Sequence, residues 1–145
     1  MEMSQDVLKS LVENVVRATL EACASGAPYK HVDPSGIIGI KTSQVALEPF
    51  EGRSDVLLAD VTALEEAPRM GCGIMELKDA ASFEWTLTYD EYDIVLEGTL
   101  EIEIDGRVVS AAPGEIIYIP KGSHIHFQTP DHAKYVYTVF PADWQ

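Results

Sequence analysis

Two acidic residues near the middle of the chain, Glu91 and Asp93, are the leading candidates for chemistry. One residue separates them, so both side chains point to the same face if this segment is a β-strand. Carboxylates that share a buried site either raise the pKa of one member or recruit a cation. The pair could therefore act as a general base or anchor Mg²⁺ for a nucleotide substrate. The alternative is that both residues cap turns or accept backbone N–H groups at the end of a barrel.

Four further residues could complete such a site. Tyr89 could supply a hydroxyl group, although it could equally be a core tyrosine whose polar tip is satisfied. Lys121, Ser123 and His126 are weaker candidates for substrate binding, and a solvated or hydrogen-bonded side chain is the alternative for His126. The chain has no GxxxxGK[ST] phosphate-binding loop, so Lys121 is the nearest cation that could face a phosphate.

The composition excludes several classes of partner. The chain has 145 residues, 46% of them hydrophobic, which suffices for the core of one domain. Its net charge of −14 repels nucleic acids and anionic membrane surfaces, so we expect neither as a partner. No apolar stretch reaches membrane-spanning length and no basic signal-peptide flank begins the chain, so we expect a cytoplasmic protein. Cys23 and Cys72, without CxxC spacing, fit reduced thiols.

The elements that must position these residues fall into three segments. Apolar residues recur at three- and four-residue steps from Val7 to Leu20, which predicts an amphipathic helix over residues 1–25. Gly26 and Pro28 end it and begin a linker over residues 26–35. Two roles are open for the helix: it could dock in the apolar groove of a partner, or it could pack on its own domain or across a dimer.

Residues 36–145 read as short strands separated by turn residues, which predicts an all-β barrel domain. The predicted strands cover residues 37–40, 42–47, 56–61, 72–77, 83–88, 92–96, 99–104, 107–110, 116–119 and 135–140. Asp105-Gly106 between two of them predicts a type I′ hairpin.

Two glycine spacings narrow the fold class further. Glu91 is followed after six residues by Gly98, and Gly114 is followed by Pro120 and Gly122 at fixed spacing. Together these resemble the two motifs of the cupin family. The resemblance implies a cupin (double-stranded β-helix or jelly-roll) barrel, here preceded by the N-terminal helix.

The histidines that bind a metal in most cupins are missing from the matching positions. In the first motif, counting back from Glu91, those positions hold Trp85 and Leu87, or Glu84 and Thr86 if the spacing to Glu91 is one residue longer. In the second motif the position holds Ile125. His124 and His126 flank Ile125 but are off by one residue. One carboxylate and one displaced histidine are too few ligands for a transition metal. We expect no tightly bound Fe, Mn or Zn.

A more specific resemblance covers residues from about Val56 onward. It is carried by Trp85-Thr86-Leu87, Tyr89-Asp90-Glu91, Asp93, Val95-Leu96-Glu97-Gly98, Ile119-Pro120-Lys121-Gly122-Ser123 and Pro141-Ala142-Asp143-Trp144-Gln145. These sequence segments resemble those of the ethanolamine utilisation family EutQ. The resemblance implies a cytoplasmic protein of the bacterial microcompartment for ethanolamine breakdown, and a cupin for which an acetate kinase activity has been proposed. Longer family members carry a large segment ahead of the cupin, where this chain has the helix and linker.

We therefore expect an ethanolamine utilisation cupin, dimeric as its fold class implies, with Glu91, Asp93 and Tyr89 at its site. If it is an enzyme, it is a Mg²⁺-dependent acetate kinase, a phosphotransferase that uses ATP. The alternative is a non-catalytic assembly or adaptor protein that binds shell or core proteins, with the helix as one contact.

Overall fold

The computed structural model describes residues 5–25 and 28–144, and side chains of the helix through residue 16. The chain divides between Gln44 and Val45 into two compact units, which are described separately. The first contains helix α1 (Gln5–Ser25), strands β1 (Lys30–Val32) and β2 (Ile38–Ile40), which pair antiparallel, and a short 3-10 helix, η1 (Thr42–Gln44). Strand β1 lies within the segment expected to be a linker, and β2 belongs with the first unit rather than with the barrel.

Over residues 5–16, helix α1 exposes its apolar residues as well as its polar ones. Leu8, Leu11 and Val12 are each about half exposed, at 48%, 52% and 52%. None of the described helices is both long enough and apolar enough to cross a membrane.

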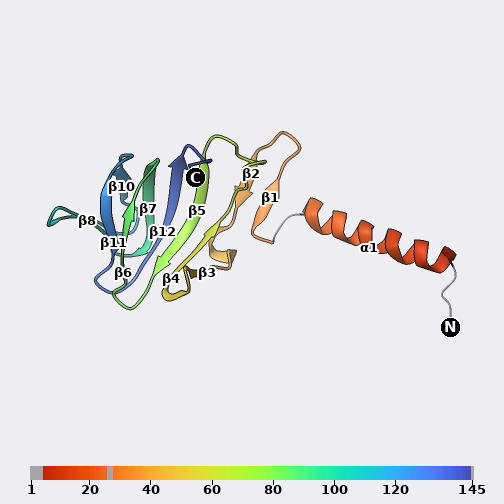
Figure 1. The fold of residues 1–145 in the computed structure, drawn as a ribbon, viewed down its shortest axis with the longest axis horizontal. Coiled ribbons are helices and arrows are strands. Elements are labelled where there is room, and N and C mark those ends of the chain that lie inside the picture. Colours follow the sequence, from red (N-terminus) through yellow and green to blue (C-terminus); the bar gives the residue numbers. More distant parts are fainter. Residues whose placement is uncertain (1–4, 26–27, 145) are drawn as a thin grey trace. The chain divides into compact units, whose positions relative to one another are not determined.

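The second unit is built from two antiparallel sheets (Figure 1). The six-stranded sheet has the order β10-β7-β12-β5-β4-β3 and the four-stranded sheet the order β6-β11-β8-β9. Their strands are β3 (Glu48–Phe50), β4 (Arg53–Asp60), β5 (Gly71–Leu77), β6 (Ser82–Thr86), β7 (Asp90–Gly98), β8 (Leu100–Ile104), β9 (Arg107–Ala111), β10 (Ile116–Ile119), β11 (His124–Gln128) and β12 (Ala133–Phe140). The predicted all-β fold with one N-terminal helix is confirmed.

The core lies on the facing sides of the two sheets, and several strands direct alternate residues into it. Strand β12 shows this most clearly: Ala133, Tyr135, Tyr137 and Val139 are buried, and the residues between them are only partly buried. Asp105 and Gly106 join β8 to β9 with positive φ values of 48° and 76°, as the predicted type I′ turn requires.

Several local predictions differ from the structure. Residues 42–47 were expected to form a strand, but the N–H of Gln44 donates to the carbonyl of Lys41 and closes the 3-10 turn η1. Strand β3 was not among the predicted strands, and it contains Pro49. It lies at the edge of the six-stranded sheet, where proline can lack a hydrogen-bond donor without breaking the ladder.

Candidate functional site

Strand β7 directs Glu91 and Asp93 into the core, as the alternation predicts. Glu91 is 4% exposed and Asp93 is fully buried, whereas Tyr92 between them is 53% exposed. Neighbouring strands cover both residues: Val139 and Tyr137 of β12 lie opposite Glu91 and Asp93 on one side, and β10 lies on the other. The structure therefore brings the two carboxyl groups together inside the barrel.

Tyr89 lies next to this pair and belongs to an aromatic cluster. It is 6% exposed, and its hydroxyl oxygen accepts a hydrogen bond of 2.9 Å from Nε1–H of Trp85. The ring of Trp144 lies 4.9 Å from that of Tyr89. Burial raises the pKa of Tyr89, and the nearby Glu91 carboxyl raises it further. Tyr89 is thus a neutral hydroxyl at neutral pH, fixed in position by Trp85.

Sequence reasoning missed two further tyrosines that face the core, Tyr135 and Tyr137 of β12. The hydroxyl of Tyr137 donates to Oδ1 of Asp60 at 2.5 Å, and that of Tyr135 contacts Sδ of Met75 at 2.8 Å. The Tyr137 ring passes over Gly73, where a Cβ atom would lie 2.1 Å from the ring. The period-two pattern of β12 could have identified both tyrosines as inward facing, but their partners come from distant strands.

Burial dominates the electrostatics of the acidic pair. It raises the pKa of Asp93 well above its usual value, and the Glu91 carboxyl adds to the shift. Burial also raises the pKa of Glu91, while contacts with Asp93 and Tyr89 offset part of that effect. Two buried carboxylates this close cannot both remain ionised without a compensating charge. The pair therefore retains a proton at neutral pH or binds a cation.

The acceptor atoms of Asp93 fit a cation. No N–H or hydroxyl group among the residues that the structure describes donates to either of its carboxyl oxygens, and the Glu91 carboxyl group lies within hydrogen-bonding reach of them. Buried acceptors of this kind are rarely left unpaired in native proteins. Mg²⁺ prefers carboxylate oxygens and keeps several water ligands, so Asp93 and Glu91 are suitable residues to hold it. Such an ion would offset the charge of the pair.

The three weaker candidates lie elsewhere. Lys121 is exposed, and its backbone N–H donates to Oδ1 of Asp90. The Ser123 hydroxyl donates to the carbonyl of Pro120 at 2.7 Å within the turn. His126 points away from the core because Ile125 and Phe127, its neighbours on β11, are buried. The structure thus does not join these residues to Glu91 and Asp93.

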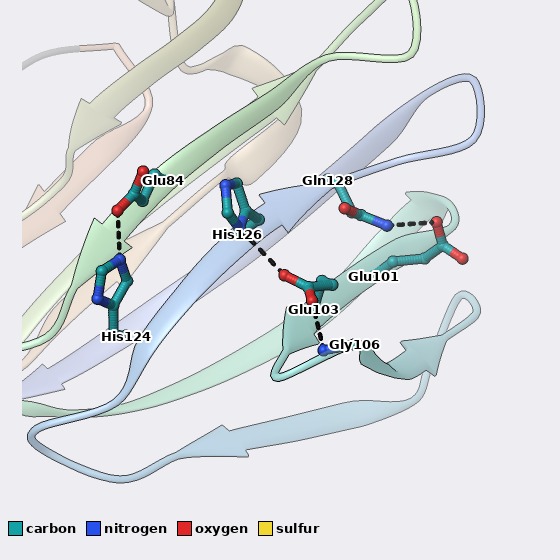
Figure 2. A network of polar contacts seen from close by, with 7 residues as sticks. All are labelled: Glu84, Glu101, Glu103, Gly106, His124, His126 and Gln128. Atoms are coloured by element: carbon teal, nitrogen blue, oxygen red, sulfur yellow. Dashed lines mark hydrogen bonds and ion pairs between the residues drawn. The ribbon is translucent and has the colours of Figure 1, made fainter.

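The outer face of the four-stranded sheet carries a row of polar pairs instead (Figure 2). His124 of β11 pairs with Glu84 of β6. Nδ1 of His126 lies 3.0 Å from Oε2 of Glu103 on β8. Both histidines therefore have carboxylate partners on the outside of the barrel.

The positions that hold metal-binding histidines in most cupins are apolar and packed. Leu87 and Ile125 are each 1% exposed, and Trp85 contacts Phe50, Phe83 and Trp144. The inner face of the barrel at these positions thus presents hydrocarbon and aromatic rings.

The amino-acid sequence of the chain is similar to those of known proteins. The family described as "Ethanolamine utilisation protein EutQ" matches residues 3–145. A protein of Clostridioides difficile named "Acetate kinase EutQ" is 46% identical over 147 residues, which cover 94% of this chain and 93% of that protein. The Escherichia coli protein of the same name is 35% identical, and the match covers 99% of this chain but 64% of that longer protein.

Solved structures agree with the sequence matches. The structure of the Clostridium difficile EutQ protein superposes with a TM-score of 0.74 at 50% identity, covering 79% of this chain and 88% of that one. The cupin domain of Schizosaccharomyces pombe Cnp3 gives a TM-score of 0.60 at 15% identity, over 71% of this chain and 73% of that one. The latter likeness concerns the fold alone, and it shows that the barrel has the cupin fold.

Proposed function

Because the chain belongs to the ethanolamine utilisation protein EutQ family, we propose that it takes part in ethanolamine breakdown in the bacterial microcompartment, as an acetate kinase. The observation that supports this site best is Asp93, a fully buried carboxyl group that receives no hydrogen bond from a described N–H or hydroxyl group and lies beside a second buried carboxyl group. A core carboxylate destabilises a fold unless it has a partner. Such a loss of stability is expected at a catalytic or binding site.

The reaction itself restricts what Glu91 and Asp93 can do. An acetate oxygen attacks the γ-phosphorus of ATP, and the new O–P bond forms as the bond to the bridging oxygen breaks. ADP leaves with that electron pair. Acetate is already ionised at neutral pH, so this direction needs no general base; it needs positive charge near the phosphoryl group. Mg²⁺, when bound, supplies that charge.

The acidic pair must also tolerate an anionic substrate. Two ionised carboxylates would repel acetate, whereas the raised pKa of Asp93 favours its protonated form, which can donate a hydrogen bond. Tyr89, held by Trp85, offers a hydroxyl group that remains protonated. The residues of the chain thus bind and orient acetate, with Mg²⁺ entering together with ATP rather than as a tightly bound cofactor.

Acetyl phosphate formation from ATP and acetate tests this proposal, with hydroxylamine to trap the product. Glu91→Gln and Asp93→Asn should each lower the rate by about 10²-fold, as expected for loss of a hydrogen-bonding group that acts in the transition state. Glu84→Gln, which alters an exposed carboxyl on the outer sheet face, should leave the rate unchanged. Activity that survives both core substitutions would exclude this site.

A second candidate function, a non-catalytic adaptor for shell or core proteins, is favoured by helix α1. Its side chains at Leu8 and Val12 are exposed one helical turn apart, which suits an apolar groove on a partner. Wild-type protein that is pure, folded and inactive in the acetyl phosphate assay would favour this function.

The adaptor function predicts that Leu8→Glu/Val12→Glu abolishes co-sedimentation with microcompartment shells while the melting temperature of the barrel stays the same. Ser10→Glu/Asn14→Glu is the matched control, because it adds the same charge at the same spacing on another face of the helix. If the Leu8/Val12 variant instead aggregates or unfolds, the helix has a structural role.

We also propose that the chain forms a homodimer through the outer face of β7 and β10. Ile116 and Tyr118 of β10 are 60% and 50% exposed, and the Tyr118 ring lies 5.0 Å from that of Tyr92. Contiguous exposed apolar side chains of this kind mark interfaces. Light scattering should show that Ile116→Glu is monomeric and that Val108→Glu, on strand β9 of the other sheet, remains dimeric. A dimeric Ile116→Glu variant would contradict this interface.

A further inference from the structure

A β-bulge in strand β7 turns Glu97 away from the core. Lys134 lies opposite Glu97, and Tyr135 lies opposite Val95, so Leu96 is an extra residue in this strand. Strict alternation would place Glu97 on the inner face with Val95, which is 1% exposed. Because of the bulge, Glu97 is exposed on the outer face.

Two other side chains of types that can bind metals lie beside Glu97 on that face. Glu76 is on β5, opposite Lys134, and His132 immediately precedes β12. Nε2 of His132 lies 3.1 Å from Oε2 of Glu76. One ligand atom from each of Glu76, Glu97 and His132 lies within 4.8 Å of the other two. Ligands of a tetrahedral zinc ion are about 3.3 Å apart, so a small side-chain rotation of Glu97 is enough to close the site.

The backbone around His132 is fixed independently of these side chains. The His132 carbonyl accepts a 2.9 Å hydrogen bond from the N–H of Thr99, and the preceding Asp131 carbonyl accepts one from Ala80. The same His132 carbonyl packs on Gly98, next to Glu97, in the space that a side chain at Gly98 would fill. Main-chain contacts therefore hold the backbone of His132 next to that of Glu97, which favours a pre-organised site.

We propose that Glu76, Glu97 and His132 bind a divalent transition-metal ion, Zn²⁺ by the nature of the donors, on the outer face of the six-stranded sheet. One imidazole and two carboxylates suit Zn²⁺ better than Mg²⁺, which prefers oxygen ligands throughout. Three protein ligands leave the fourth position to water. This site is separate from the buried pair Glu91 and Asp93.

The charges around the site leave a carboxylate oxygen for the ion. Nζ of Lys78 lies 3.4 Å from Oε1 of Glu76, whereas Oε2 of Glu76 faces His132. Burial acts to raise the pKa of Glu76, but His132 and Lys78 outweigh it and the pKa is lowered. Lys134, opposite both glutamates, is a second nearby positive charge, besides Lys78, that an incoming Zn²⁺ ion must displace or tolerate.

Titration of the full chain with Zn²⁺ by calorimetry tests the proposal at pH 7.5. We expect one ion per chain, and His132→Ala and Glu97→Gln should each weaken its binding at least about tenfold. His126→Ala is the matched control, because His126 also pairs with a glutamate, Glu103, yet among the described residues that pair gains no third ligand. Co²⁺ should give the intense visible absorption of a tetrahedral site in wild type and lose it in His132→Ala.

Zinc binding that is unchanged in His132→Ala and Glu97→Gln, or no binding at all by the wild type, would overturn the site. Circular dichroism should show that these variants are folded. Asp93→Asn should leave Zn²⁺ binding intact, so this site and the proposed kinase site can fail independently of each other.

Discussion

Gly98→Ala should destabilise the barrel by more than about 3 kcal/mol, the scale of a backbone clash that nothing nearby can relieve. Gly98 has a φ of 71°, and a Cβ atom there would lie 1.9 Å from the His132 carbonyl oxygen and 2.6 Å from its carbon. Both atoms belong to the backbone, and the oxygen is held by the N–H of Thr99. The clash therefore cannot be removed by rotating a side chain. Urea unfolding measures the loss.

Gly106→Ala is the control that separates the clash from the cost of the backbone conformation. Gly106 has a similar φ of 76°, but a Cβ atom there would meet nothing within 4 Å. The Gly106→Ala variant should lose only about 1–2 kcal/mol in free energy of unfolding, which is the cost of a left-handed conformation for an L-residue. If both variants lost the same free energy of unfolding, the His132 carbonyl would not be close enough to Gly98 to clash with a Cβ atom.

Asp93→Asn should stabilise the protein, and the gain should grow as the pH rises. The pKa of Asp93 is raised in the folded state, mainly by burial, whereas the unfolded chain has an ordinary aspartate. Above the unfolded pKa, the folded state holds a proton that the unfolded state has lost, so the free energy of unfolding falls with increasing pH until the folded pKa is passed. Asparagine removes this dependence. The gain at pH 8 should exceed that at pH 5 by about 1–3 kcal/mol.

Chemical denaturation at both pH values measures this difference. Glu84→Gln gives the baseline for loss of an exposed carboxyl group, and its effect should be small at both pH values. The contrary result is a wild type whose free energy of unfolding rises between pH 5 and pH 8, with the same slope in Asp93→Asn. It would mean that Asp93 is ionised in the folded state and that another charge neutralises it. Together with the kinase assay, the measurement would show whether activity and stability oppose each other at this residue.

Much of the barrel follows from local signals in the sequence. Period-two alternation along β7 predicts that Glu91 and Asp93 face the core, and Asp105-Gly106 predicts the hairpin between β8 and β9. Strand β3 escapes such reasoning because Pro49 is tolerated only through its place at a sheet edge, which depends on the tertiary fold.

The surroundings of the acidic pair were harder to predict. Asp60 and Tyr137 meet across 77 residues of sequence, with Gly73 between their strands providing space for the ring. The bulge that turns Glu97 outward is equally hidden, since a run of Val95-Leu96-Glu97 fits unbroken alternation as well. Conversely, Lys121, Ser123 and His126 are near the motif in sequence, but the turn and the alternation of β11 direct them elsewhere. Proximity in sequence and proximity in the fold diverge at these residues.

The aromatic cluster around Tyr89 provides a built-in spectroscopic reporter. Trp85 and Trp144 are the two tryptophans of the chain, and their rings lie 6.3 Å apart. Trp85 is hydrogen-bonded to Tyr89, and Trp144 packs against the same ring. All tryptophan emission therefore originates beside the candidate site, and none originates in helix α1. Quenching or a wavelength shift on adding acetate, ATP or Mg²⁺ would report occupancy there directly, without any attached dye.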